Sequence, residues 1–119
     1  MRETAYHPAA MDWRMERVAK NEARHRELNE LILASYESHT EEAYMDVVCE
    51  CGREACDVFL RVTKAEYEDV RSDARHFLIH QEHFDLQAER VVSERDRFTV
   101  VAKREGKPAE IARQTDPRG

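Results

Sequence analysis

The chain has 119 residues, a length that fits one domain with a modest core. Its 25 acidic and 19 basic residues give a net charge of −6. This balance argues against sequence-independent nucleic-acid binding and against docking on anionic membranes, because both need an excess of Lys and Arg. No apolar run approaches a bilayer-spanning length and the first residues lack the apolar stretch of a signal peptide, so we expect a cytoplasmic protein with reduced thiols.

A helical pattern runs from about residue 11 to residue 38, after a lead-in (residues 1–10) that shows no period and that we expect to be flexible. Apolar side chains recur along it at three-, four- and seven-residue steps and predict one apolar face, which Asn21, Glu22 and Asn29 interrupt. At 1.5 Å per residue such a helix is about 40 Å long, so we expect part of it to project or to pair with another chain. For a self-associating helix the predicted interaction surface comprises Met15, Val18, His25, Leu28 and Ile32.

The second half of this helix and the segment after it are acidic, with no Lys or Arg between Glu27 and Arg53. Two interpretations stay open. The charges either form a solvated helix surface or provide an acidic contact surface for a basic partner protein.

Short strands and one short helix follow. The sequence Thr63-Lys-Ala-Glu66 is a capping box, which predicts that a helix begins there and runs to about Arg71. Alternating apolar residues and turn signals predict strands at 44–51, 57–62 and 77–79, and a hairpin of 89–93 with 98–103. The segment 105–119 carries two Gly and two Pro among mostly polar residues, and we expect a mobile tail there. The predicted fold is therefore a single α+β domain over residues 11–104, with a long N-terminal helix and a small, mostly antiparallel sheet.

Three cysteines within eight residues, Cys49, Cys51 and Cys56, predict a metal site. Cys49 and Cys51 are two apart on a predicted strand, which places both sulfurs on one face. A turn containing Gly52, whose backbone adopts conformations that most residues resist, can bring Cys56 to the same ion. The cofactor we expect is a structural zinc ion, because zinc favours a closed tetrahedral shell of sulfur and nitrogen.

A histidine must complete this shell. His83 follows a predicted strand in a loop and can approach freely, His80 is the alternative, and His76 is less conveniently placed. The same thiols also fit a second hypothesis, a redox or metal sensor in which oxidation of two cysteines releases the ion.

Catalysis is the weakest hypothesis for this chain. His80-Gln81-Glu82 has the H-x-E form found in zinc deaminases, but the P-C-x-x-C partner is missing and the cysteines precede the histidine. There is no H-E-x-x-H motif and no glycine-rich phosphate loop. Three Cys and one His would also leave no coordination position for a substrate, so we expect no catalytic residues.

These motifs resemble a group of small, largely uncharacterised actinobacterial proteins. The likeness rests on an N-E-x-x-x-R-x-L-N-E helix (Asn21 to Glu30), the V-C-E-C-G sequence (Val48 to Gly52), Glu66-Tyr67 and Glu89 to Val92. It runs from about residue 20 to residue 106. The resemblance implies a metal-bearing domain without a known reaction, and it favours His83 over His80 as the fourth ligand. Two departures are Gln81-Glu82, where a Pro-Gly is usual, and His25, where an aromatic residue is common.

The sequence thus favours a non-enzymatic, zinc-stabilised module that binds a protein partner or a second copy of itself through the N-terminal helix. The zinc- or redox-sensor hypothesis stands second and a zinc-dependent enzyme third.

Overall fold

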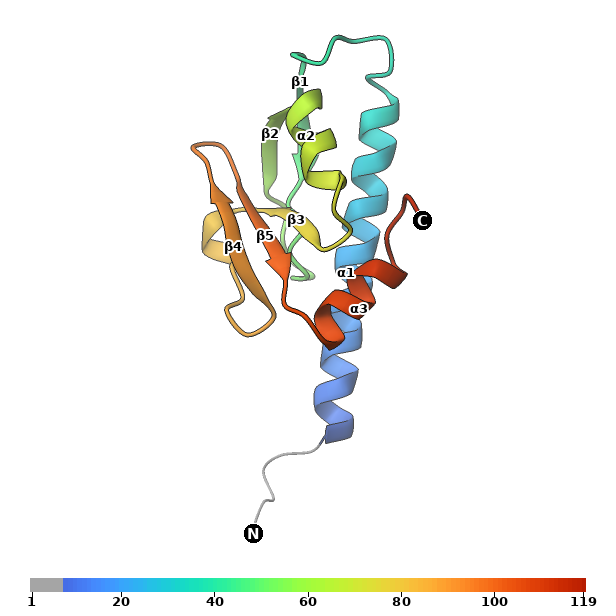
Figure 1. Cartoon of the computed structure of the whole chain (residues 1–119), viewed down its shortest axis with the longest axis vertical. Helices are drawn as coiled ribbons and strands as arrows, with labels where there is room; N and C mark the ends of the chain where they lie inside the picture. The colour runs from blue at the N-terminus through green and yellow to red at the C-terminus, as the bar shows by residue number, and fades with distance from the viewer. Residues whose placement is uncertain (1–7) are drawn as a thin grey trace.

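The computed structural model describes residues 8–119, with side chains from Trp13 onward. Figure 1 shows the long helix α1 running beside all the other elements, with its N-terminal turns extending past them. The elements in chain order are α1 (Pro8–Ala34), β1 (Tyr44–Val48), β2 (Phe59–Thr63), α2 (Lys64–Arg71), β3 (His76–Ile79), the 3₁₀ turn η1 (Gln81–His83), β4 (Glu89–Glu94), β5 (Thr99–Lys103) and α3 (Lys107–Gln114). The predicted α+β class is confirmed.

The strands form two small antiparallel sheets instead of one. β1 pairs with β2, and the second sheet has the order β3-β5-β4 with a bulge between Val91 and Ser93. In the first sheet every second residue is buried, so Met45 and Val47 pack inward with Leu60 and Val62. β5 is buried along its whole length because β3 and β4 flank it. The backbone N–H of Glu50 donates to Leu78 O at 2.7 Å and so ties the end of β1 to β3.

The middle of α1 turns polar side chains toward the sheets. Glu22, Arg26 and Asn29 are buried there, and each is hydrogen-bonded across the domain. Arg26 also stacks on the Phe77 ring, with its guanidinium carbon 4.3 Å from the ring centroid. The residues that seemed to interrupt an apolar face are therefore part of the packed face, because each finds a buried polar partner.

α2 begins as the capping box predicts. Thr63 Oγ1 accepts from the backbone N–H of Glu66 at 3.1 Å, and the Glu66 carboxylate accepts from the backbone N–H of Thr63 at 2.8 Å. These two bonds satisfy donors that the first helical turn leaves free. The helix buries Tyr67 and Val70 against the first sheet.

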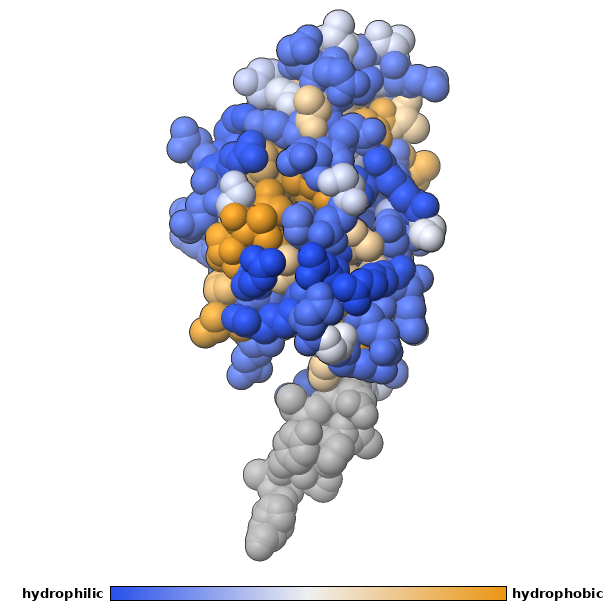
Figure 2. Space-filling view, in the orientation of Figure 1, coloured by the Kyte–Doolittle hydropathy of each residue, from blue (hydrophilic) through white to orange (hydrophobic). Residues whose placement is uncertain are grey.

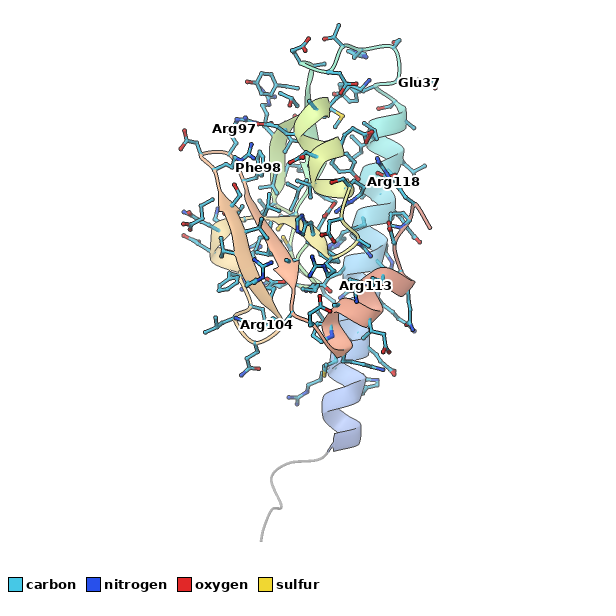
Figure 3. All side chains as sticks on the ribbon, viewed as in Figure 1. Glu37, Arg97, Phe98, Arg104, Arg113 and Arg118 are labelled. Atoms are coloured by element: carbon cyan, nitrogen blue, oxygen red, sulfur yellow. The ribbon has the colours of Figure 1, made fainter. Side chains whose placement is uncertain are left out.

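The segment predicted to be a mobile tail contains a helix. Residues 107–114 form α3, which begins with Pro108 in its first turn and buries Ala109 and Ala112. Its C-terminal end is held by Arg26, which donates to Ala112 O at 2.8 Å. Figure 3 shows Arg118 beside α1, where it pairs with Glu30, so the domain extends to the C-terminal residues. Of the predicted lead-in, residues 8–10 belong to α1 and residues 1–7 lie outside the described residues.

The surface is mostly hydrophilic on the face shown in Figure 2, with apolar side chains gathered over β4 and β5. Val91 and Val92 of β4 are among the exposed apolar residues. Within residues 8–119, no helix combines the length and the apolar character that a membrane crossing demands.

Candidate metal centre

Two connecting segments bring the predicted metal ligands together. Cys49 and Cys51 directly follow β1, Cys56 precedes β2, and His83 ends the 3₁₀ turn η1 after β3. The three sulfurs and one ring nitrogen of His83 all lie within 4.8 Å of one another. Cys49 and Cys51 are buried, while Cys56 and His83 are half-buried at the rim. These four residues could therefore hold a metal ion between the two sheets.

The distances match the edges of a zinc tetrahedron. Nδ1 of His83 is 3.4 Å from Cys49 Sγ and 3.6 Å from Cys56 Sγ. With Zn–S of about 2.3 Å and Zn–N of about 2.0–2.1 Å, a tetrahedral ion separates nitrogen and sulfur by about 3.6 Å. These two nitrogen–sulfur separations are thus close to those that a four-coordinate ion requires, and the four residues would supply all of its ligands.

The electrostatics of the three thiols favour a cation. A hydrogen bond from the Cys49 thiol lowers the pKa of Cys51 to about 4, and the same bond raises the pKa of Cys49. Burial raises the pKa of Cys56. Without a cation, one thiolate is therefore stabilised by the two neighbouring thiols, because three adjacent negative sulfurs repel one another. A divalent ion removes that repulsion and lets all three sulfurs bind in the ionised form.

Backbone N–H groups point at the sulfurs as well. His80 N–H donates to Cys49 Sγ at 3.3 Å. The backbone N–H groups of Arg53 and Val58 hydrogen-bond to the sulfurs of Cys51 and Cys56; the first bond helps to lower the pKa of Cys51, and the second opposes the rise that burial causes in the pKa of Cys56. Donors of this kind stabilise thiolate charge and fix the direction of each sulfur, which is the role of the outer shell in metal sites.

The structure brings His83 into the cluster and leaves His80 outside it. Nδ1 of His80 accepts from the backbone N–H of Glu82 at 3.1 Å and so caps η1. The two imidazole rings are 5.3 Å apart, centroid to centroid. His76 lies on β3 beside Asp73, at 3.5 Å, and is not in the cluster either.

Two local arguments for the site need correction. β1 ends at Val48, so Cys49 and Cys51 share a loop and not a strand face. Gly52 does not have a positive φ, since within the described residues only Gly106 and Gly119 do. Gly52 is instead required by close packing: a Cβ there would lie 2.3 Å from Val18 Cγ1 and 2.8 Å from Val18 O. The loop at Gly52 lies too close to the α1 backbone at Val18 to leave room for any side chain.

A residue that the sequence argument passed over supports the site. Glu50, between Cys49 and Cys51, is fully buried and forms a two-point ion pair with Arg71 at 2.7 and 2.9 Å. Its carboxylate also accepts from Asn29 Nδ2 at 2.7 Å and from the backbone N–H of Leu78 at 3.0 Å. In the sequence, the one sign of this role is an acidic residue between two cysteines of a predicted metal site. If such a residue is buried, it needs a cationic partner.

The predicted interaction surface does not form one exposed seam. Met15, Val18 and Leu28 are 39%, 42% and 43% exposed. His25 turns inward, where its Nδ1 lies 2.9 Å from Cys51 O, and Ile32 packs against the core. Of the five predicted residues, Met15, Val18 and Leu28 are therefore exposed enough to contact another protein, whereas His25 and Ile32 are not.

Comparisons of the chain with protein-family models, with curated proteins and with solved structures found no match.

Proposed function

We propose that this chain is a non-enzymatic, zinc-stabilised module that binds a partner protein. The observation that carries the proposal is the closed donor set of Cys49, Cys51, Cys56 and His83, whose separations fit a four-coordinate zinc ion. A shell of four protein donors leaves no position for a substrate or an activated water. In this proposal zinc joins the segment after β1 to the turn after β3.

X-ray absorption at the zinc edge tests the structural role of the ion. The protein, purified without added metal, should contain one zinc per chain with three sulfurs at about 2.3 Å and one nitrogen at about 2.0–2.1 Å. A stable oxygen ligand, bound either as a fifth ligand or in place of one of the four protein donors, would overturn the non-enzymatic proposal, because it would mark an open catalytic site. Absence of metal from a folded sample would overturn the zinc proposal itself.

The contact surface in this proposal is the side of α1 that faces away from the sheets. Trp13 and Leu31 are 56% and 70% exposed there, and Leu28 lies between them along the helix. The same face carries Lys20 and Arg24, both exposed. Apolar anchors flanked by basic side chains fit a partner that presents an apolar patch with acidic residues around it.

Matched variants test this surface. Leu31→Glu places a negative charge in the proposed contact and should abolish partner capture from the native host and any self-association seen in solution. Leu86→Glu, at a position 66% exposed on the opposite part of the domain, is the control and should change neither. The same captured proteins with wild type and Leu31→Glu would refute α1 as the contact surface.

A further inference from the structure

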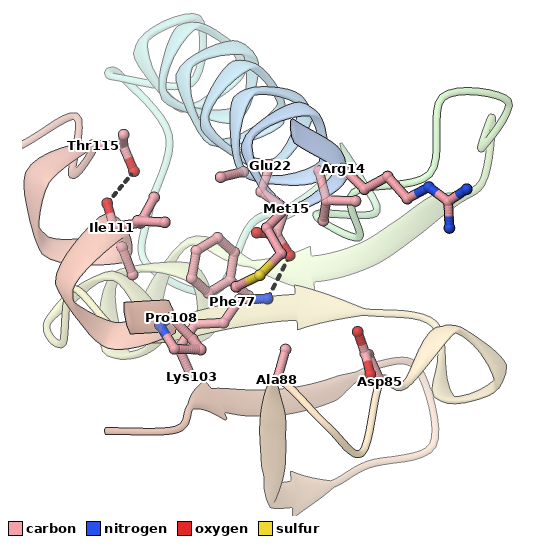
Figure 4. Close-up of a pocket in the computed structure, with 13 residues that line it drawn as sticks. Arg14, Met15, Glu22, Phe77, Asp85, Ala88, Lys103, Pro108, Ile111 and Thr115 are labelled. Atoms are coloured by element: carbon pink, nitrogen blue, oxygen red, sulfur yellow. Dashed lines mark hydrogen bonds and ion pairs between the residues drawn. The ribbon is translucent and has the colours of Figure 1, made fainter. Parts of the chain in front are cut away.

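A pocket of about 160 Å³ opens between the first half of α1, α3 and the sheet β3-β5-β4 (Figure 4). Its walls are mainly apolar and are formed by Met15, Val18, Phe77, Ala88, Pro108 and Ile111. An apolar cavity of about 150 Å³ accommodates one benzene ring in a well-studied protein. The pocket is therefore large enough for a ligand of one ring, and it is separate from the four metal-site residues, none of which lines it.

Buried charges form the polar part of this pocket. Lys103 Nζ donates to Glu22 Oε2 and, at 2.9 Å, to Glu89 Oε2. All three residues are buried, and Glu22 and Lys103 line the pocket. Glu89 Oε1 accepts from the backbone N–H of Asp85 at 3.0 Å. By contrast, no group among the described residues donates to Glu22 Oε1, so this buried carboxylate keeps one free acceptor at the pocket.

The charge of this group selects against anions. Burial raises the pKa of Glu22 to about 7, so above that pH one ammonium lies between two carboxylates, which leaves a net charge of −1 beside the apolar walls. Figure 4 shows the Arg14 guanidinium directed away from the other labelled residues, so it does not offset that charge inside the pocket. A ligand anion would therefore meet Glu22 without a free cation, whereas a ligand ammonium would find a carboxylate oxygen at the pocket wall.

We propose that the pocket binds a small apolar amine, one ring or branched alkyl group bearing a protonated amino group, with the nitrogen on Glu22 Oε1 and the apolar part against Phe77 and Ile111. This site goes beyond the proposed function and does not depend on it, because none of its residues takes part in metal binding or in the proposed contact face.

The first test is an NMR titration of the full chain as purified, at about pH 8 so that Glu22 is ionised and the amine protonated, with three probes of similar size: benzylamine, benzyl alcohol and benzoate. Benzylamine should bind with a Kd of about 1 mM, as expected for a fragment of eight non-hydrogen atoms, and should shift the signals of Met15, Phe77 and Ile111. Benzoate should bind at least about tenfold more weakly because of the charge beside it. Equal binding of benzoate and benzylamine, or no shift with benzylamine at about 10 mM, would overturn the proposal.

Three variants locate the site. Ala19→Phe places a ring inside the pocket and should abolish benzylamine binding, while Ala23→Phe, the same change one helical turn later on a different groove, should leave it intact. Glu22→Gln should weaken benzylamine binding about tenfold and leave benzyl alcohol binding unchanged, because only the charge-assisted bond is lost. Undiminished benzylamine binding by Ala19→Phe, or an equal loss for both probes in Glu22→Gln, would contradict the assignment.

Discussion

Free zinc should set the stability of this domain. The folded chain holds four donors within 4.8 Å, whereas an unfolded chain spreads residues 49 to 83 apart, so one ion binds the folded state in strong preference. For one such site the free energy of unfolding rises by about 1.4 kcal/mol with each tenfold increase in free zinc above the Kd. Across about four decades of free zinc the gain is about 5 kcal/mol, comparable with the whole stability of a small domain.

Urea denaturation in zinc-buffered solutions measures this slope. The midpoint should move to higher urea with each increase in free zinc, while the dependence on urea concentration stays the same. Calcium or magnesium should have no such effect, since both prefer oxygen ligands. A midpoint independent of free zinc, in protein that remains folded after chelation, would refute the role that we assign to the cluster.

Two histidine variants make the test specific. His83→Ala removes a donor and should shift the zinc dependence to free zinc concentrations more than about a hundredfold higher, because losing even a supporting residue costs about 10–100-fold in affinity. His80→Ala removes only the cap of η1 and should keep the wild-type zinc dependence. The reverse result would identify His80 as the ligand.

Four further outcomes follow from the described contacts. Gly52→Ala should lower the free energy of unfolding by about 1–3 kcal/mol in urea titrations because the new methyl group would overlap Val18, and an unchanged midpoint would disprove that packing. Glu50→Ala should cost about 3–5 kcal/mol by the same measurement, since it leaves a buried guanidinium unpaired, against about 0–1 kcal/mol for Asp46→Ala, whose ion pair is exposed. Burial raises the pKa of Glu22 to about 7 from 4.5, so the folded state retains a proton that the unfolded chain releases, and stability should fall by about 3 kcal/mol as the pH rises from 4.5 to 7 relative to Glu22→Gln at saturating zinc. Parallel pH profiles of these two proteins would contradict this. Mild hydrogen peroxide should leave the zinc bound, because two of the three sulfurs are buried; prompt release to a zinc-sensitive dye would favour the redox-sensor alternative.

The sequence predicted best those features that depend on a few neighbouring residues. The capping box at Thr63 places the start of α2 because both of its hydrogen bonds are local. The hairpin of β4 and β5 and the short strand at Phe77 follow from runs of apolar residues bounded by polar turns. The cysteine spacing likewise identified three members of the cluster, whereas the choice of histidine depended on how η1 folds.

The packed side of α1 could not be predicted in this way. The apolar period of the sequence runs through Met15 and Leu28, which are exposed. Glu22 and Asn29 interrupt that period and yet are buried. Polar side chains become favourable in a core only when each finds a partner, and the partner of Glu22 lies 81 residues away. α3 was missed for the same reason, since its eight residues are stabilised by a buried arginine from α1.

The buried polar contacts also connect the metal site to the rest of the domain. Glu50 lies between Cys49 and Cys51 in the chain, and its carboxylate binds α1 through Asn29, α2 through Arg71 and β3 through Leu78. A shift of the Cys49–Cys51 segment therefore moves a buried carboxylate away from three elements at once. Because unpaired buried charges cost several kcal/mol, the loop cannot loosen without the core loosening as well. Zinc binding should consequently stabilise the whole domain cooperatively, and not the Cys49–Cys51 segment alone.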